Sequence, residues 1–258
     1  MSGALEAAAA TALPLVFLVS LRVGVILALM PPPFSTMTPI SIRAVLTLWI
    51  AGATALPLDL APPASHEPLL LVGAGLGEIM VGSVIGLTVR VTLAAVEIAG
   101  TVAGFSMGLG FATSVDPTLG EATLPTTRLL GYFGALIFLV FEGHHAVVGA
   151  IVTSLQLAPP GAVMEVFASE AALGVGSSML ARGLQIAAPV VATMFIVQLG
   201  TALVARAAPR VQLFSLTFAV AVTIGLLSLF AAAPTIARAI GIAVRGLPSA
   251  LADVLGVR

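Results

Sequence analysis

A short segment near the middle of the chain places one carboxylate and two imidazoles together, and such side chains bind metal ions or relay protons. They belong to Glu142, His144 and His145, with Gly143 between the acid and the first histidine. Neighbouring residues on a helix point about 100° apart, so adjacent histidines cannot easily share one ion, whereas zinc proteases place two histidines at i and i+4. We therefore expect no metal ion and no cofactor here. A proton relay and a polar contact at a helix end or subunit interface remain as interpretations.

Two further acids, Asp116 and Glu121, could act as an acid and base pair. The sequence places no nucleophile with a neighbouring base and no phosphate-binding loop beside them. Turn and helix-start roles are the simpler interpretation, since Pro117 follows Asp116 directly. An intramembrane hydrolase would depend on the histidine cluster alone, and we predict that the chain is not an enzyme.

The composition indicates the class of protein that must position these groups. Apolar residues make up 59% of the 258 residues, charged residues make up 8%, and the mean hydropathy is +1.18. Several uncharged runs approach or exceed the ~20 residues that cross a ~30 Å hydrocarbon core, most clearly 183–205 and 211–237. Backbone amides in lipid must be paired internally, so we predict an all-α, multi-pass integral membrane protein. The net charge of −1 is not that of the basic surfaces that bind nucleic acid, so we expect no nucleic-acid partner.

Proline and acidic clusters divide the apolar sequence into candidate helices, with broken segments and helical hairpins among them. Proline lacks an amide donor and disfavours helix in the residue before it, so 31–33 is predicted to stop the first helix and 57–68 to be a connection. A second connection is predicted to begin at 158–161 and to carry Glu165 and Glu170. The candidate helices are 11–30, 40–56, 69–95, 96–112, 129–157, 171–205 and 211–233.

The flanking charges give a partial orientation, because cytoplasmic flanks of membrane helices are enriched in arginine and lysine. Arg206 and Arg210 would face the cytoplasm, and the acidic connections at 57–68 and 158–170 would face the other side. This assignment holds only if 96–112 does not cross the membrane, which favours a re-entrant or buried segment there.

Charged residues inside the apolar runs need partners or water, since each would cost about 2.5–3.5 kcal/mol at the centre of a bilayer. Arg90 and Glu97 lie about 10 Å apart along a helix axis, which favours pairing with neighbouring helices. Snorkelling to an interface or capping a helix end is the alternative. It fits Glu78 least well, because five nearby glycines indicate close helix packing, within the chain or between subunits. The charged residues are Arg22, Arg43, Glu78, Arg90, Glu97, Glu142 and Arg182.

The segment 100–117 combines glycines with apolar residues and almost no charge, which suits a pore lining or a plug. Gly100, Gly104 and Gly108 recur at every fourth position, so a helix there would present a bare stripe to another backbone. Gly108 and Gly110 also weaken the helix, because a glycine costs roughly 1 kcal/mol relative to alanine in a helix interior. The acid and proline at the end of the segment are predicted to stop it.

Three separated motifs give the chain a resemblance to a known family. They are MGLGFATSVDPTLGE at 107–121, FEGHHAVVGAIVTSLQLAPPGA at 141–162 and RAAPRVQLF at 206–214. Over essentially its whole length the chain resembles the FliR family of flagellar type III export-gate proteins, and the GHH segment favours the flagellar branch over the injectisome homologue. The chain departs from the family at Pro209 and Arg210, where proline-glutamine is usual.

The resemblance implies a single-copy subunit that joins FliP and FliQ in a ring-like export channel, contacts FlhB and adjoins the larger gate protein FlhA. It implies one FliR-type membrane domain over 1–258, with a FliP-like part at about 1–175 and a FliQ-like helical hairpin at about 176–258. The implied location is the flagellar basal body in the bacterial inner membrane, and the implied substrates are unfolded flagellar proteins. The hairpin would turn at a cytoplasmic-entrance loop that contains Arg206, Pro209 and Arg210.

The family also places a plug loop in the closed pore, and the matching positions are about 104–116. We hypothesise an apolar seal that an unfolded substrate displaces, because soft side chains adapt to different sequences and a hydrophobic constriction can gate by dewetting. Ordinary core residues of a buried helix are the alternative. The predicted seal residues are Gly104, Phe105, Met107, Gly108, Leu109, Gly110, Phe111 and Asp116.

A small-solute or ion secondary transporter is the alternative function, because glycine-interrupted helices and midplane charges also mark such transporters. It would predict an internal repeat of the glycine-rich run at 69–95. The sequence after Leu129 contains no clear counterpart of that run.

Overall fold

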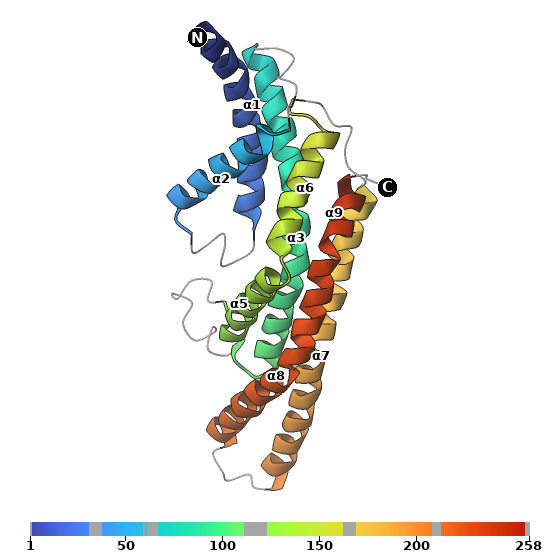
Figure 1. Ribbon diagram of the computed structural model, residues 1–258. Helices are drawn as coiled ribbons and strands as arrows, with labels where there is room; N and C mark the ends of the chain where they lie inside the picture. Colours follow the sequence, from blue (N-terminus) through green and yellow to red (C-terminus); the bar gives the residue numbers. More distant parts are fainter. Residues whose placement is uncertain are drawn as a thin grey trace. The chain divides into compact units, whose positions relative to one another are not determined.

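The computed structural model describes residues 2–30, 38–58, 60, 67–110, 123–161, 169–207 and 213–255. All regular structure in these ranges is helical, which confirms the predicted all-α class (Figure 1). The helices are α1 (Ser2–Leu29), α2 (Ile40–Ala55), α3 (Pro68–Ser106), α5 (Pro125–Val140), α6 (Gly143–Leu157), α7 (Ser169–Ala207), α8 (Leu213–Arg245) and α9 (Leu247–Leu255).

The described helices confirm a multi-pass membrane protein. Four segments are long and apolar enough to cross a bilayer, and α5 and α6 would add a fifth span if they cross together. α2 is apolar but shorter than these spans. The four segments are Ala12–Leu29, Leu69–Ser106, Leu180–Arg206 and Thr217–Leu255.

The chain divides into two compact units, each of which collects segments that are distant in sequence. Because α3 and α7 are long, each of them contributes residues to both units. Unit 1 comprises Met1–Thr92, Glu142–Val175 and Arg245–Arg258, and unit 2 comprises Leu93–Phe141 and Gly176–Val244.

In unit 1, α1 buries side chains at three- and four-residue spacing, which is the period of one helix face. α3 approaches α1 closely, since a Cβ added at Gly82 would lie 2.6 Å from the carbonyl oxygen of Arg22. The close packing predicted from the glycines near Glu78 is therefore present within the chain. The buried stripe of α1 comprises Leu15, Leu18, Val19, Arg22, Val23 and Ile26.

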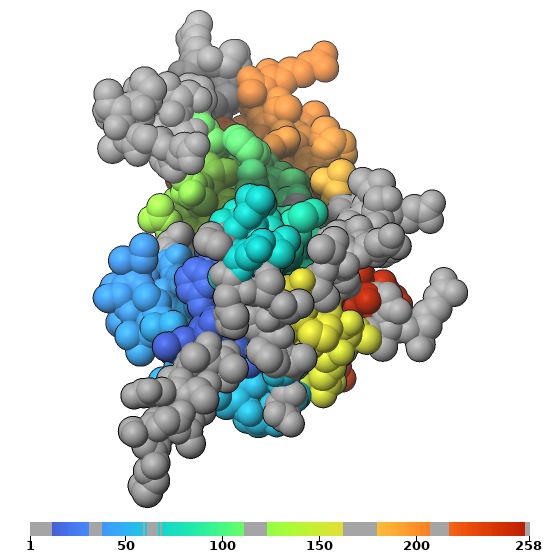
Figure 2. All heavy atoms as spheres, turned by 90° about the horizontal axis from the view of Figure 1, so that it is seen from above, coloured from blue at the N-terminus to red at the C-terminus, as the bar shows by residue number. Residues whose placement is uncertain are grey.

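Two smaller helices complete unit 1. α9 packs against α6, and α2 packs against α1. α2 leaves apolar side chains uncovered, including Ile40 at 82% and Trp49 at 75% exposure. The space-filling view shows this helix as an uncovered blue layer beside α1 (Figure 2).

In unit 2, the end of α3 buries Ala95, Ala99 and Ala103 at every fourth position, so the side chains on this face of the helix are small. They allow α7 to pack closely against α3, since a Cβ at Gly183 would lie 2.9 Å from the carbonyl oxygen of Ala95. Ser228, near the middle of α8, donates to the hydroxyl oxygen of Thr193, near the middle of α7, at 3.3 Å. Since only five residues separate the end of α7 from the start of α8, the two helices run antiparallel.

The continuity of α3 corrects the predicted division at residue 95. Pro68–Ser106 is one helix of 39 residues, so separate helices at 69–95 and 96–112 are wrong, and so is a separate re-entrant segment at 96–112. No proline interrupts this sequence before Ser106, and glycine alone weakens a helix without removing its hydrogen bonds.

The predicted helix 129–157 is instead two helices, α5 and α6, with a break at Phe141 and Glu142. Glu142 has a φ of 57°, in the left-handed region that side chains other than glycine rarely adopt. A single left-handed residue changes the chain direction, so the break needs no proline.

The C-terminal helices also extend beyond the predicted end at residue 233. α8 continues through Pro234 to Arg245, and α9 follows it. Membrane helices tolerate proline because neighbouring groups can satisfy the freed carbonyl. The ribbon of α8 bends along its length, and Pro234 is the residue at which a bend is expected (Figure 1).

Candidate functional site

The predicted seal begins at the C-terminal end of α3, which closes with a glycine cap. The amide of Leu109 donates to the carbonyl oxygen of Gly104, and the amide of Gly108 donates to that of Phe105, both at 3.0 Å. Gly108 has a φ of 80°, so these bonds form a Schellman motif with glycine in the left-handed conformation. Gly108 therefore ends the helix and does not continue the bare stripe formed by Gly100 and Gly104.

Gly100 and Gly104 pack against the start of α5. A Cβ at Gly100 would lie 2.6 Å from the Cα of Thr127, and a Cβ at Gly104 would collide with the hydroxyl oxygen of Thr126. Thr126 donates to the carbonyl oxygen of Gly100 at 2.8 Å, and the hydroxyls of Thr101 and Thr127 lie 2.9 Å apart. The predicted stripe thus exists for two of its three glycines, and α5 is its partner.

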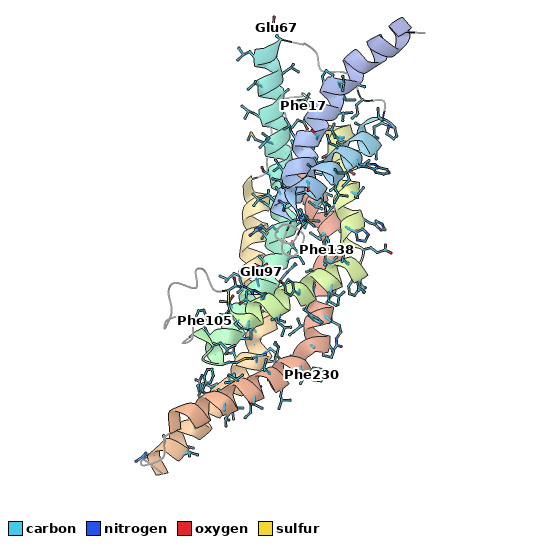
Figure 3. All side chains as sticks on the ribbon, turned by 90° about the vertical axis from the view of Figure 1, so that its left-hand side faces the viewer. Phe17, Glu67, Glu97, Phe105, Phe138 and Phe230 are labelled. Atoms are coloured by element: carbon cyan, nitrogen blue, oxygen red, sulfur yellow. The ribbon has the colours of Figure 1, made fainter. Side chains whose placement is uncertain are left out.

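The two large apolar residues at the end of α3 lie in different environments. Phe105 is 62% exposed, and its ring stands at the end of the helix (Figure 3). Met107 is only 1% exposed and lies over Gly225 of α8. Between them, the carbonyl oxygen of Ser106 accepts a hydrogen bond from the side-chain amide of Gln198 in α7 at 3.1 Å. The end of α3 is therefore fastened to both helices of the α7–α8 hairpin.

A buried ion pair joins α1 to α3 in unit 1. Nε and Nη2 of Arg22 donate to Oε2 and Oε1 of Glu78 at 2.6 and 3.1 Å, and both residues are 1% exposed. Nη1 of Arg22 donates to the hydroxyl of Ser154 and Nη2 to the carbonyl oxygen of Ala158, both at 3.0 Å. The amide of Gly161 donates to Oε1 of Glu78 at 3.3 Å. Both charges are paired and hydrogen-bonded, as a membrane interior requires.

The histidine cluster lies at the start of α6. Nδ1 of His145 lies 3.3 Å from Oε2 of Glu142, with both side chains largely exposed, so this contact is weak. The rings of His144 and His145 contact each other, with centroids 4.3 Å apart. In the part of the chain that the structure describes, no group of three or more ligating side chains could hold a metal ion.

The remaining charges have mixed environments. Arg90, Arg182 and Arg206 are exposed, whereas Glu97 is half-buried. Arg43 is also half-buried and donates to the carbonyl oxygen of Thr38 at 3.3 Å. Four predicted site residues lie outside the described residues: Phe111, Asp116, Pro209 and Arg210.

Several partners in these sites were not expected from the sequence. Ser154 could have been suspected, because a polar side chain in an apolar run such as 129–157 requires a hydrogen-bond partner. Gly225 is an isolated glycine in its run, and Thr126 is one of two adjacent threonines, so neither has a distinguishing pattern.

Comparison with known proteins assigns the family. The family model for bacterial export proteins, family 1, matches residues 13–246. The flagellar biosynthetic protein FliR of Escherichia coli (strain K12) is 30% identical over 223 residues, covering 84% of this chain and 83% of that protein. FliR of Pectobacterium carotovorum subsp. carotovorum is 29% identical over 191 residues, covering 74% of this chain and 71% of that protein. FliR of Caulobacter vibrioides is 29% identical over 217 residues, covering 81% of this chain and 84% of that protein. The chain therefore belongs to family 1 of the bacterial export proteins, the FliR family.

Proposed function

We propose that this chain is a membrane subunit of the flagellar type III export gate, where it forms with FliP and FliQ the channel for unfolded flagellar proteins. The similarity to E. coli FliR over 84% of the chain carries the proposal. The proposed location is the flagellar basal body in the inner membrane, with FlhB and FlhA as further partners. The role is non-enzymatic, because the chain lines and gates a path for other proteins.

Uncovered apolar side chains on the α7–α8 hairpin support an assembled, membrane-bound role. On α7, Phe195, Ile196 and Leu203 are 61%, 69% and 70% exposed, and Phe230 on α8 is 81% exposed (Figure 3). Such surfaces are stable only against lipid or other proteins. We assign the FliQ-like role to this hairpin, at about 176–258, and the FliP-like role to the preceding part.

The proposed gate is closed by the seal at about 104–116. The Schellman motif supports this role because it gives the chain a defined direction as it leaves α3. Phe105 supports it because its ring is uncovered at that point. The proposed entrance loop contains Arg206, Pro209 and Arg210.

Co-purification tests the assembly. A tagged copy of the chain, extracted from its own bacterium in mild detergent, should bring down FliP and FliQ. A tagged multi-pass transporter from the same membranes serves as the control and should recover neither protein. Isolation of the chain with lipid alone would contradict the proposal.

Ion leak tests the seal. Gates reconstituted into vesicles with Phe105→Ala, or with residues 104–110 deleted, should pass more potassium than the unaltered gate while no substrate is present. Phe195→Ala is a matched control, because Phe195 is 61% exposed, nearly the same as the 62% of Phe105, but lies on α7. An unchanged leak in the deletion variant would refute the seal.

A further inference from the structure

Gly225 of α8 makes a close contact with Met107 that no sequence pattern predicts. A Cβ built on Gly225 would lie 2.5 Å from Cγ of Met107 and 2.8 Å from both its Sδ and its Cε. Real Cβ atoms do not approach other heavy atoms this closely, so any side chain at 225 would displace Met107. Because three atoms of Met107 cover this site, rotating only its terminal methyl group would not make room.

The contact is buried and belongs to a fastened segment. Met107 is 1% exposed, and it immediately precedes Gly108, the glycine of the Schellman motif. One residue before Met107, the carbonyl oxygen of Ser106 accepts the hydrogen bond from Gln198. The last turn of α3 is thus held by a hydrogen bond from α7 and by the fit of a methionine onto bare backbone of α8.

The hydrogen bond and the packing that hold the end of α3 depend differently on residue identity. The bond from Gln198 reaches a backbone carbonyl, which every residue at 106 would provide. The packing depends on residue identity at two positions, since it needs a long flexible side chain at 107 and no side chain at 225. Methionine suits a contact that forms and separates, because its unbranched chain adapts to different surroundings.

We propose that Gly225 is the positioning residue of the seal. It seats Met107 and thereby fixes the end of α3 in the closed state, and the two residues separate when a substrate chain passes. This inference rests on the proposed function, since it assigns a seat to the seal of the export gate.

A reversible cross-link tests the separation. The chain contains no cysteine, so within the chain Met107→Cys combined with Gly225→Cys can form only the intended disulfide. The sulfur of a cysteine at 107 would take the place of the Met107 Cγ, which lies 2.5 Å from the Cβ of residue 225, so it would be within reach of the sulfur of a cysteine at 225. Oxidation of assembled gates should form the disulfide and stop export of flagellar proteins, and a reductant should restore export.

The single-cysteine variants are the controls, and their export should not respond to the oxidant. Efficient cross-linking with unchanged export would overturn the separation, and failure to cross-link in the assembled gate would overturn the contact. A failure of the proposed function is told apart by a deletion strain, because cells lacking the gene would then export flagellar proteins normally.

Alanine substitutions test the seat without cysteines. Gly225→Ala should raise the ion leak of the closed gate, because the new methyl group would displace Met107 from its position over α8. Gly200→Ala on α7 is the matched control, because a Cβ there would meet nothing within 4 Å. Equal leaks for Gly225→Ala and Gly200→Ala would overturn the proposal.

Discussion

Replacing Glu78 by glutamine should destabilise the chain strongly, although the two side chains have nearly the same shape. Glu78 accepts two charge-assisted hydrogen bonds from Arg22, and both residues are 1% exposed. A glutamine offers one acceptor oxygen and turns an NH₂ group toward the second guanidinium donor. Hydrogen bonds to charged groups are worth about 1.5–3 kcal/mol, and removing one partner of a buried ion pair costs about 3–5 kcal/mol. We therefore expect Glu78→Gln to lower the free energy of unfolding by about 3–5 kcal/mol.

The assay is titration of the purified chain in micelles with a denaturing detergent, followed by the helical circular dichroism signal. Arg90→Gln on the same helix is the control, because Arg90 is exposed and such substitutions usually change stability by less than about 0.5 kcal/mol. The double variant Arg22→Met with Glu78→Leu should be more stable than Glu78→Gln, since it leaves no buried charge unpaired. A loss below about 1 kcal/mol in Glu78→Gln would refute the reasoning, as would a double variant less stable than Glu78→Gln.

Three further predictions follow from the backbone and the histidines. Gly82→Ala should lower the free energy of unfolding by about 1–3 kcal/mol, because its Cβ would meet the backbone of α1. Gly73→Ala on the same helix should be neutral or stabilising, because a Cβ there would meet nothing within 4 Å. Equal unfolding free energies for the two variants would contradict the close packing of α3 against α1. Gly108→Ala should cost about 1–2 kcal/mol because its φ is 80°, and an unchanged unfolding midpoint would contradict the left-handed cap. Replacing His144 and His145 together by alanine should leave secretion of flagellar proteins mostly intact. Complete loss of secretion with normal assembly would instead favour the proton-relay interpretation of these histidines.

The sequence predicts the class and most helices because membrane crossing depends on composition. Long apolar runs leave no alternative to helix in lipid, so α1, α2 and α7 begin or end within a few residues of the prediction, apart from the earlier start of α1. The glycine spacing also predicts close packing correctly, at Gly82, Gly100 and Gly104. Apolar runs and glycine spacing are local patterns, so they can be identified from the sequence alone.

The errors concern features that depend on tertiary structure. Glu142 adopts a left-handed conformation although its side chain disfavours it, and no proline marks the break between α5 and α6. Pro234 looks like a stop signal, but α8 continues through it. The sequence predicts a division of α3 at residue 95, but α3 is a continuous helix of 39 residues.

The candidate sites show the same limit. The sequence predicts that Glu78 needs a partner, but it cannot select Arg22, which lies 56 residues away. Ser154 and Gly225 join their sites only because distant helices meet there. Side chains in the seal were predicted as one group, and packing separates exposed Phe105 from buried Met107.

Secretion of flagellar proteins into the medium tests the central claim most directly. In the source bacterium, deletion of the gene for this chain should abolish that secretion, and a plasmid copy of the unaltered chain should restore it, while secretion through the general secretory pathway stays normal. Undiminished export of flagellar proteins by the deletion strain would contradict the assignment of this chain to the export gate.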